Sequence, residues 1–184
     1  MLGAQRVRAD DIVIAMASSG LHSNGYSLVR HVLLKHARLR LDQHIDELGT
    51  TLGEELLVPT RIYSLDCLAL VAAVDVHAFS HVTGGGLAAN LDRVLPAGVD
   101  VEIDRTTWAP APIFELIRRV GDVATPELER TLNMGVGMVA VVASADADRA
   151  LAVLTDRDVR CWVAGRARAG EGPGATTLVG SHPR

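Results

Sequence analysis

The chain has 184 residues, of which 48% are apolar and 22% are charged, and its formal net charge is −4 at pH 7. This length and balance predict one domain with an ordinary hydrophobic core and exclude general disorder. No apolar run approaches the ~18 residues of a membrane helix, the start of the chain lacks the apolar block of a signal peptide, and the basic residues form no face for nucleic acid. We therefore expect a cytoplasmic α/β protein without membrane or nucleic-acid partners.

Short apolar runs, typical of buried strands, alternate along the chain with helix-spaced apolar stripes. Residues 1–10 are expected to be a lead-in to one domain that covers residues 11–180. The expected strands are residues 11–17, 74–82, 99–103, 137–142, 160–163 and the edge pair 178–179. The expected helices are residues 25–37, a short turn between 51 and 59, then 60–73, 87–94, 112–120, a short helix from 125, and 146–154. Residues 38–50 and 165–174 are expected to be loops.

Local signals predict where three of these helices begin. Thr51 and Glu54 have the spacing of a capping box, and Pro112 occupies a first-turn position. Thr60 is expected to cap the helix that follows it. The apolar stripe of that helix is Ile62, Leu65, Leu68, Ala69, Ala72 and Ala73.

The alternation of strands and helices predicts a layered α/β (α+β) fold, with a mixed sheet flanked by helices. Residues 137–163 form a strand-helix-strand unit within it. This unit is expected to be a ferredoxin-like split β-α-β element.

Cysteine and histidine usage predicts no metal site. Cys67 and Cys161 lie far apart and outside any C-x-x-C pair, so neither a disulfide framework nor a thiolate zinc site is expected. His77 and His81 would share one face of a strand, but no third or fourth ligand lies near them in the sequence. The sequence also lacks a Walker loop and a G-x-S-x-G nucleophile motif.

The loop at residues 18–25 lies between an expected strand and an expected helix and is rich in hydrogen-bonding groups. Its candidate substrate- or phosphate-binding residues are Ser18, Ser19, Gly20, His22, Ser23 and Asn24. A helix N-terminus offers unpaired N–H groups and a positive dipole end, so this loop could hold a phosphate without any lysine. The alternative is that Ser23 or Asn24 only caps the helix.

A second loop with the same setting consists of Thr83, Gly84, Gly85 and Gly86. Consecutive glycines let the backbone approach a ligand closely and present N–H groups as a nest. His81 stands just before this loop and, with His22, is a candidate catalytic residue, although a lone histidine at a strand end is more often packed or solvated.

If the strands before these two loops are neighbours, both helix N-termini point into one groove, where their dipoles add. An anion should then lie near a set of residues from both loops. The set is Ser19, His22, Thr83 and Gly85.

A third loop, Asn133, Met134 and Gly135, leads into a strand. By itself this pattern predicts a helix C-cap at Gly135 with Met134 in the core.

Residues 84–89 also fit the dinucleotide-binding pattern G-x-G-x-x-A, and Asp104 follows about twenty residues later. A dinucleotide-binding oxidoreductase domain therefore stays open as an alternative. Against it, the helix after the glycines is only about two turns long, and the loop at residues 18–25 would have no role.

Four strings, in order along nearly the whole chain, are similar to a known family. They are SSGLHSNGYSLVR (18–30), LGEELLVPTRIY (52–63), HVTGGGLAANLDRVLP (81–96) and TLNMGVGM (131–138). These strings resemble the C-terminal half of aminoimidazole ribonucleotide synthetases, also called phosphoribosylformylglycinamidine cyclo-ligases. Leu132 stands where that family usually has phenylalanine.

The resemblance implies a ligase of purine biosynthesis that uses ATP to close the imidazole ring of formylglycinamidine ribonucleotide, giving aminoimidazole ribonucleotide. It implies that residues 18–24, 83–86 and 133–135 line a groove between two domains, so that the third loop does more than cap a helix. It also implies a fold shared with related ATP-dependent kinases and synthetases, such as thiamine monophosphate kinase, which stay as an alternative.

The resemblance further implies that ATP and Mg²⁺ are bound mainly by an N-terminal half that has no counterpart in these 184 residues, and that the full enzyme is a homodimer. The partners of this chain are then the ribonucleotide substrate and its own N-terminal domain. Because phosphoryl transfer needs its charge neutralised, we expect the chain alone to bind no cofactor tightly and to have no cyclo-ligase activity.

Overall fold

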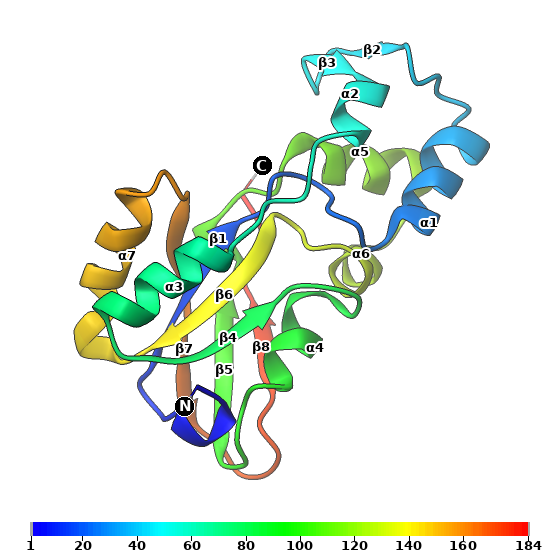
Figure 1. Ribbon diagram of the computed structural model, residues 1–184. Coiled ribbons are helices and arrows are strands. Elements are labelled where there is room, and N and C mark those ends of the chain that lie inside the picture. The colour runs from blue at the N-terminus through cyan, green and yellow to red at the C-terminus, as the bar shows by residue number, and fades with distance from the viewer. Residues whose placement is uncertain (1, 184) are drawn as a thin grey trace.

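The computed structural model of the chain describes residues 2–183 and is centred on one mixed β-sheet (Figure 1). Within these residues the sheet has six strands in the order β4-β6-β1-β7-β5-β8. The strands are β1 (Ile12–Ala17), β4 (Val76–His81), β5 (Val99–Asp104), β6 (Val136–Val142), β7 (Cys161–Ala169) and β8 (Thr176–Val179). Neighbouring strands are antiparallel except β5 and β8, which are parallel. The mixed sheet with its flanking helices confirms the predicted fold class.

The predicted split β-α-β element is present. Strands β6 and β7 are joined by helix α7 (Ala147–Thr155), and β1 lies between them, antiparallel to both. In the same way α3 (Ser64–Ala73) leads into β4, which is separated from β1 by β6. Helices α3 and α7 lie side by side on one face of these four strands, which completes a ferredoxin-like arrangement (Figure 1).

Both faces of β1 are covered, which explains why its sequence is a continuous apolar run. Ile14 and Met16 pack with Leu154 of α7 on one face. On the other face, Val13 packs with Leu91 of α4 (Gly86–Asp92).

A smaller helical lobe extends from one end of the sheet (Figure 1). Its elements are α1 (Tyr26–Arg30), which continues as a π-helix (His31–His36), α2 (Leu52–Leu56), α5 (Pro112–Gly121), α6 (Thr125–Thr131) and the short ladder of β2 (His44–Ile45) with β3 (Thr50–Thr51). The capping box is confirmed, since Thr51 and Glu54 bond reciprocally, and Pro112 begins α5 as predicted. The ladder lies at the end of the segment 38–50 that was expected to be a loop and extends one residue beyond it.

The structure corrects the expected loop at residues 165–174. Strand β7 continues to Ala169, because residues 165–169 pair with residues 99–103 of β5. Ala167 is fully buried in this extension, so a Gly/Arg-rich sequence is held as a strand by tertiary pairing.

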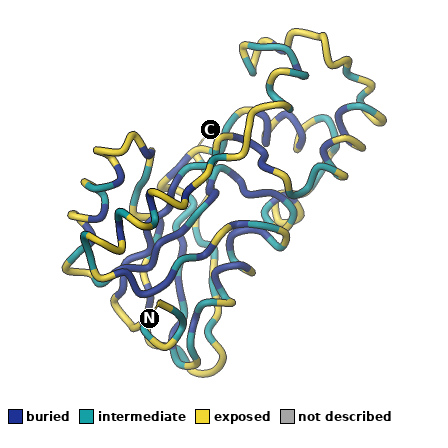
Figure 2. The backbone as a smooth tube through the Cα atoms, in the orientation of Figure 1, coloured by how far each residue is buried: buried dark blue, intermediate teal, exposed yellow. Residues whose placement is uncertain are grey.

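The apolar stripe expected for residues 60–73 is also wrong. Helix α3 begins at Ser64 rather than after Thr60, and Asp66 and Leu70 form its buried side. Leu65 and Leu68 instead face solvent. Figure 2 shows that exposed and buried positions alternate along α3. Periodicity shows that a helix has an apolar face, but it does not show which of two apolar faces the sheet will cover.

The expected lead-in packs against the sheet. Its 3₁₀ turn (Ala4–Arg6) lies beside β4, and Gly3 N–H donates to the carbonyl of His77 at 2.9 Å. Val7 is buried in the core. Within the described part of the chain, no helix combines the length and apolar character needed to cross a membrane.

Candidate functional site

Strand direction brings the three candidate loops to one edge of the sheet. Strands β1 and β4 are parallel to each other, with antiparallel β6 between them. The carboxyl ends of β1 and β4 and the beginning of β6 therefore lie at the same edge. The loops 18–25, 83–86 and 133–135 are attached to these three strand ends. A shared groove was predicted for the case that the strands before the first two loops, β1 and β4, are neighbours, but β6 lies between them. The loops still lie at the same edge, because β1 and β4 run in the same direction.

Asn133 clamps the first loop to the third. Its side-chain Nδ2 donates to the carbonyls of Gly20 at 2.8 Å and Leu21 at 2.9 Å. Its Oδ1 accepts from Gly135 N–H at 2.8 Å and lies 3.0 Å from the Ser18 hydroxyl. Helix α6 ends at Thr131, so the expected C-cap at Gly135 is wrong, while Met134 is buried as expected.

Ser19 and His22 form a second set of internal contacts. Ser19 N–H donates to His22 Nε2 at 3.1 Å, so this nitrogen is an acceptor and a neutral ring carries its proton on Nδ1. Burial, and then the neighbouring His81, lower the pKa of His22. His22 Nδ1 is buried and has no hydrogen-bond partner within residues 2–183. The Ser19 hydroxyl donates to the carbonyl of Pro59 at 2.6 Å, which ties the loop to the segment before α3.

Tyr63 lies between the two candidate histidines. Its ring centroid is 6.2 Å from that of His22 and 6.4 Å from that of His81. Its hydroxyl donates to the carbonyl of Ala17 at 2.7 Å, and burial raises its pKa. A Cβ at Gly137 would lie 1.9 Å from this hydroxyl, so only glycine fits there. Neither Tyr63 nor Gly137 stands out in the sequence, because their contact joins segments that are distant along the chain.

The glycine loop after β4 is shaped by Asn90. Asn90 Nδ2 donates to the carbonyl of Gly86 at 2.7 Å, and its Oδ1 accepts from the Thr83 hydroxyl at 2.9 Å. A Cβ at Gly84 would lie 3.7 Å from Asn24 Oδ1, so the first two loops are adjacent.

Both helices that follow these loops start at glycine. Gly25 precedes α1 with φ 81° and Gly85 precedes α4 with φ 105°, and neither helix has a side-chain cap. The alternative in which Ser23 or Asn24 caps the helix is therefore wrong. The first-turn N–H groups of α1 and α4 are not used by a capping side chain.

The predicted site residues differ in exposure, which divides them into two groups. The buried and half-buried ones are Ser18, Gly20, His22, Asn24, Thr83, Gly85, Gly86, Asn133, Met134 and Gly135. The exposed ones are Ser19, Ser23, Gly84 and, just before its loop, His81.

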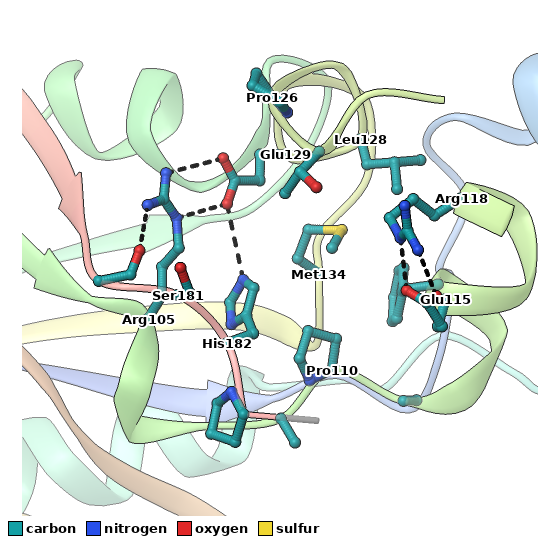
Figure 3. Close-up of a pocket in the computed structure, with 16 residues that line it drawn as sticks. Arg105, Pro110, Glu115, Arg118, Pro126, Leu128, Glu129, Met134, Ser181 and His182 are labelled. Carbon is teal, nitrogen blue, oxygen red and sulfur yellow. Dashed lines mark hydrogen bonds and ion pairs between the residues drawn. The ribbon is translucent and has the colours of Figure 1, made fainter. Parts of the chain in front are cut away.

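A separate groove of about 930 Å³ lies between α5, α6 and the C-terminal residues 180–183 (Figure 3). Met134 is the predicted site residue that lines it. Arg105 and Glu129 form an ion pair on one wall, with Nε and Oε1 2.6 Å apart, and Arg118 pairs with Glu115 at 2.7 Å on the other (Figure 3). This groove is not evident from the sequence, because the residues 180–183 that complete it lie far along the chain from α5 and α6.

No group of three or more His, Cys, Asp or Glu residues suited to a metal ion occurs within residues 2–183.

Comparison with known proteins gives a family and named relatives. The family described as AIR synthase related protein, C-terminal domain, matches residues 8–177. A Streptomyces fradiae protein provisionally named phosphoribosylformylglycinamidine cyclo-ligase is 61% identical over 180 residues, which are 96% of this chain and 99% of that protein. The cyclo-ligases of Anaeromyxobacter dehalogenans strain 2CP-1 and Myxococcus xanthus are 49% and 45% identical over 94% and 97% of this chain. The chain spans 49% and 52% of those two proteins, about half their length.

Solved structures share the fold. Thiamine-monophosphate kinase from Stenotrophomonas maltophilia has a TM-score of 0.62 at 20% identity, over 99% of this chain and 54% of its own. The hydrogenase maturation protein HypE from Escherichia coli has a TM-score of 0.60 at 19% identity, over 98% of this chain and 49% of its own.

The dinucleotide-binding alternative is not supported. The sheet is mainly antiparallel, whereas dinucleotide-binding folds use a mostly parallel sheet. A Cβ at Gly86 would lie 1.7 Å from the carbonyl oxygen of Glu129, so this glycine is packed against α6. Asp104 accepts from Thr106 N–H at 2.8 Å and caps the turn after β5.

Proposed function

The chain belongs to the AIR synthase related family as its C-terminal domain, and on that premise we propose that it is the C-terminal half of a phosphoribosylformylglycinamidine cyclo-ligase. The reaction is the ATP-dependent closure of the imidazole ring of formylglycinamidine ribonucleotide, a cytoplasmic step of purine biosynthesis. The convergence of the loops 18–25, 83–86 and 133–135 at one sheet edge is the observation that carries the proposal, because these loops hold the residues on which the family resemblance depends. We also propose that residues 11–180 form one domain, and the family match over residues 8–177 supports this.

The exposed part of the site is suited to binding the substrate's phosphate. The first turns of α1 and α4 begin at glycine N-caps, and such helix ends attract anions through their N–H groups and dipoles. Asn24 and Gly84 lie where the two loops meet, so they and Ser23 are placed to contact the ligand.

The buried residues of the site have a structural role, which is to fix the shape of the loop at residues 18–25. Ser18 and Asn133 bond to the loop backbone, and Ser19 bonds to the segment before α3. These contacts hold the loop in a single shape, which is what ring closure needs, because a near-attack geometry supplies much of the rate. His22 is buried, and this burial lowers its pKa, so we assign it a positioning role. Exposed His81 is the candidate for moving a proton at the ligand.

The cofactors belong with the other half of the enzyme. ATP, when bound with Mg²⁺, supplies the phosphoryl group that activates the formamide oxygen. The described residues 2–183 offer no acidic cluster that fits Mg²⁺, so no step is assigned to a metal held by this chain. We expect the full enzyme to be a homodimer that takes its substrate between the two halves.

A chimaera tests the proposal. In it, this chain replaces the matched half of the Myxococcus xanthus cyclo-ligase, which is 45% identical over 179 residues. The chimaera should form aminoimidazole ribonucleotide with ATP, and the chain alone should not. His81→Ala should lower kcat in the chimaera without changing its melting temperature. Arg149→Ala, at an exposed position of α7, is the control and should change neither. A folded chimaera without turnover, or turnover by the chain alone, would contradict the proposal.

A further inference from the structure

An apolar strip of exposed side chains runs from the end of α2 along α3. Its members are Leu57, Val58, Ile62, Leu65, Leu68 and Val71. Six of the nine large apolar side chains that are exposed within residues 2–183 thus lie in one short segment. Exposed apolar side chains that are concentrated in this way mark a site of contact, because on an ordinary surface they are scattered singly.

The outer side of α3 carries no charge. The helix has one charged residue, Asp66, and its side chain is buried. The exposed positions of the helix are Ser64, Leu65, Leu68, Val71 and Ala72. A surface helix of a single domain normally presents charged and polar residues to solvent. Helix α3 therefore has the composition of a helix that packs on two sides, with Leu70 against the sheet and the strip against another protein surface.

This outer side is complementary to itself. When two copies of a helix cross antiparallel on a twofold axis, residues at equal distances before and after the central residue face each other. With Leu68 at the centre, Leu65 of one copy meets Val71 of the other, because each lies three residues from Leu68. Leu65, Leu68 and Val71 are 69%, 65% and 45% exposed. The pairing therefore buries apolar side chains against one another and opposes none of them to a charge.

Positive charge lies at the beginning of α3. Arg61 stands seven residues before Leu68, and its guanidinium lies 3.7 Å from the carboxylate of Asp66. The same carboxylate accepts from Arg157 Nε at 2.9 Å. Two guanidinium groups thus share one buried carboxylate, which leaves an excess of positive charge at this end of the strip.

Carboxylates lie at the other end of α3. Asp75 stands seven residues after Leu68 and is exposed. Its backbone N–H donates to the carboxylate of Asp146 at 2.9 Å, so two acidic side chains lie together there, with Arg6 paired to Asp75. An antiparallel pairing brings Arg61 of one copy toward Asp75 of the other, whereas a parallel pairing would set like charges together. Charges at the rim of an interface select orientation and register in this way.

A relative of the same length supports a second copy of the chain as the occupant. The Streptomyces fradiae protein is 61% identical and is matched over 99% of its own length, so it has the length of one such domain. A protein of that length can cover the strip only with another chain. We propose that two copies of this chain form a twofold-symmetric dimer in which the outer sides of their α3 helices pack antiparallel around Leu68. The inference concerns association and does not depend on the proposed function.

The size of the strip predicts a weak dimer. Stable interfaces bury about 800 Å² on each partner, contributed by about 20–30 residues. The strip has six large apolar side chains, so it supplies only the centre of such an interface. We therefore expect the dimer to dissociate at micromolar concentrations.

Sedimentation velocity of the chain, from low micromolar to near-millimolar concentration, tests the proposal. The chain should pass from monomer to dimer within this range. Leu68→Glu places two carboxylates face to face at the centre of the interface and should raise the dissociation constant at least about tenfold. Leu41→Glu, at an exposed leucine outside the strip, is the matched control and should leave it unchanged. At a concentration where the chain is monomeric, both variants should keep its melting temperature, because both side chains face solvent.

Cysteine substitutions test the antiparallel arrangement independently. A disulfide forms only between residues whose Cα atoms lie within about 7 Å of each other. Under mild oxidation with a copper catalyst in air, Leu68→Cys should link to its own copy, because Leu68 lies on the twofold axis. Leu65→Cys should not link to itself but should link to Val71→Cys when the two variants are mixed. The unsubstituted chain, which has Cys67 and Cys161, gives the background.

Three results would overturn the proposal. A chain that stays monomeric over the whole series forms no such dimer. A dimer whose dissociation constant is unchanged by Leu68→Glu is held by another surface. A dimer in which Leu65→Cys links to itself, while Leu68→Cys does not, has a different register. None of these results bears on the activity of the chimaera, which tests the proposed function separately.

Discussion

Replacing Asn133 by alanine should loosen the candidate site and destabilise the whole chain. The buried amide bonds to the carbonyls of Gly20 and Leu21, accepts from Gly135 N–H and lies within reach of the Ser18 hydroxyl. At about 1 kcal/mol for each of these contacts, the free energy of unfolding should fall by about 4 kcal/mol. In a domain of this size that corresponds to a melting temperature lower by about 8–16 °C.

Urea unfolding of the chain, followed by circular dichroism, measures this change directly. Asn133→Asp should be at least as harmful as Asn133→Ala, because it turns two donors into an acceptor that faces two carbonyl oxygens. Ser23→Ala, at an exposed position of the same loop, should change the free energy by less than about 0.5 kcal/mol. A loss of less than about 1 kcal/mol in Asn133→Ala would refute the reasoning, because the amide would then not be what joins the loops.

Three further predictions are measured by the same unfolding assay. Gly86→Ala should lower the free energy of unfolding by at least about 2 kcal/mol, because its Cβ would lie 1.7 Å from a backbone oxygen of α6. Gly84→Ala should lower it by less than about 1 kcal/mol, and equal losses in the two variants would contradict this prediction. Burial lowers the pKa of His22 below the 6.5 of the unfolded chain, so its contribution to stability is complete above pH 6.5 and is lost as the pH falls below it. His22→Gln should therefore weaken the loss of stability between about pH 7 and pH 5, and an unchanged slope would count against the assignment. Asp11→Ala leaves buried His77 without the carboxylate that lies 2.6 Å from its Nδ1, and should cost about 3 kcal/mol; a change below about 1 kcal/mol would show that the pair is not needed.

Local chemistry in the sequence was enough to predict several elements. The capping box at Thr51 and the first-turn Pro112 mark helix starts that the structure confirms, because each depends on contacts within a few residues. The strand-helix-strand order of residues 137–163 also follows from short-range alternation, whereas its split form depends on β1 pairing between β6 and β7. The three candidate loops could be named for the same reason, since glycine, serine and asparagine at strand-helix joints have a local meaning.

Long-range pairing decided the rest. Strand β6 pairs between β1 and β4, and β7 pairs with β5 over residues that were expected to be a loop. Neither pairing can be predicted from a short stretch of sequence, because the paired strands are distant along the chain. The position of Tyr63 between two histidines and the walls of the groove beside Met134 depend on the same tertiary arrangement. The sequence by itself determined which residues are apolar and where the chain can turn. Only the tertiary structure decided which apolar face of α3 is buried, because burial depends on the neighbours that the sheet brings to it.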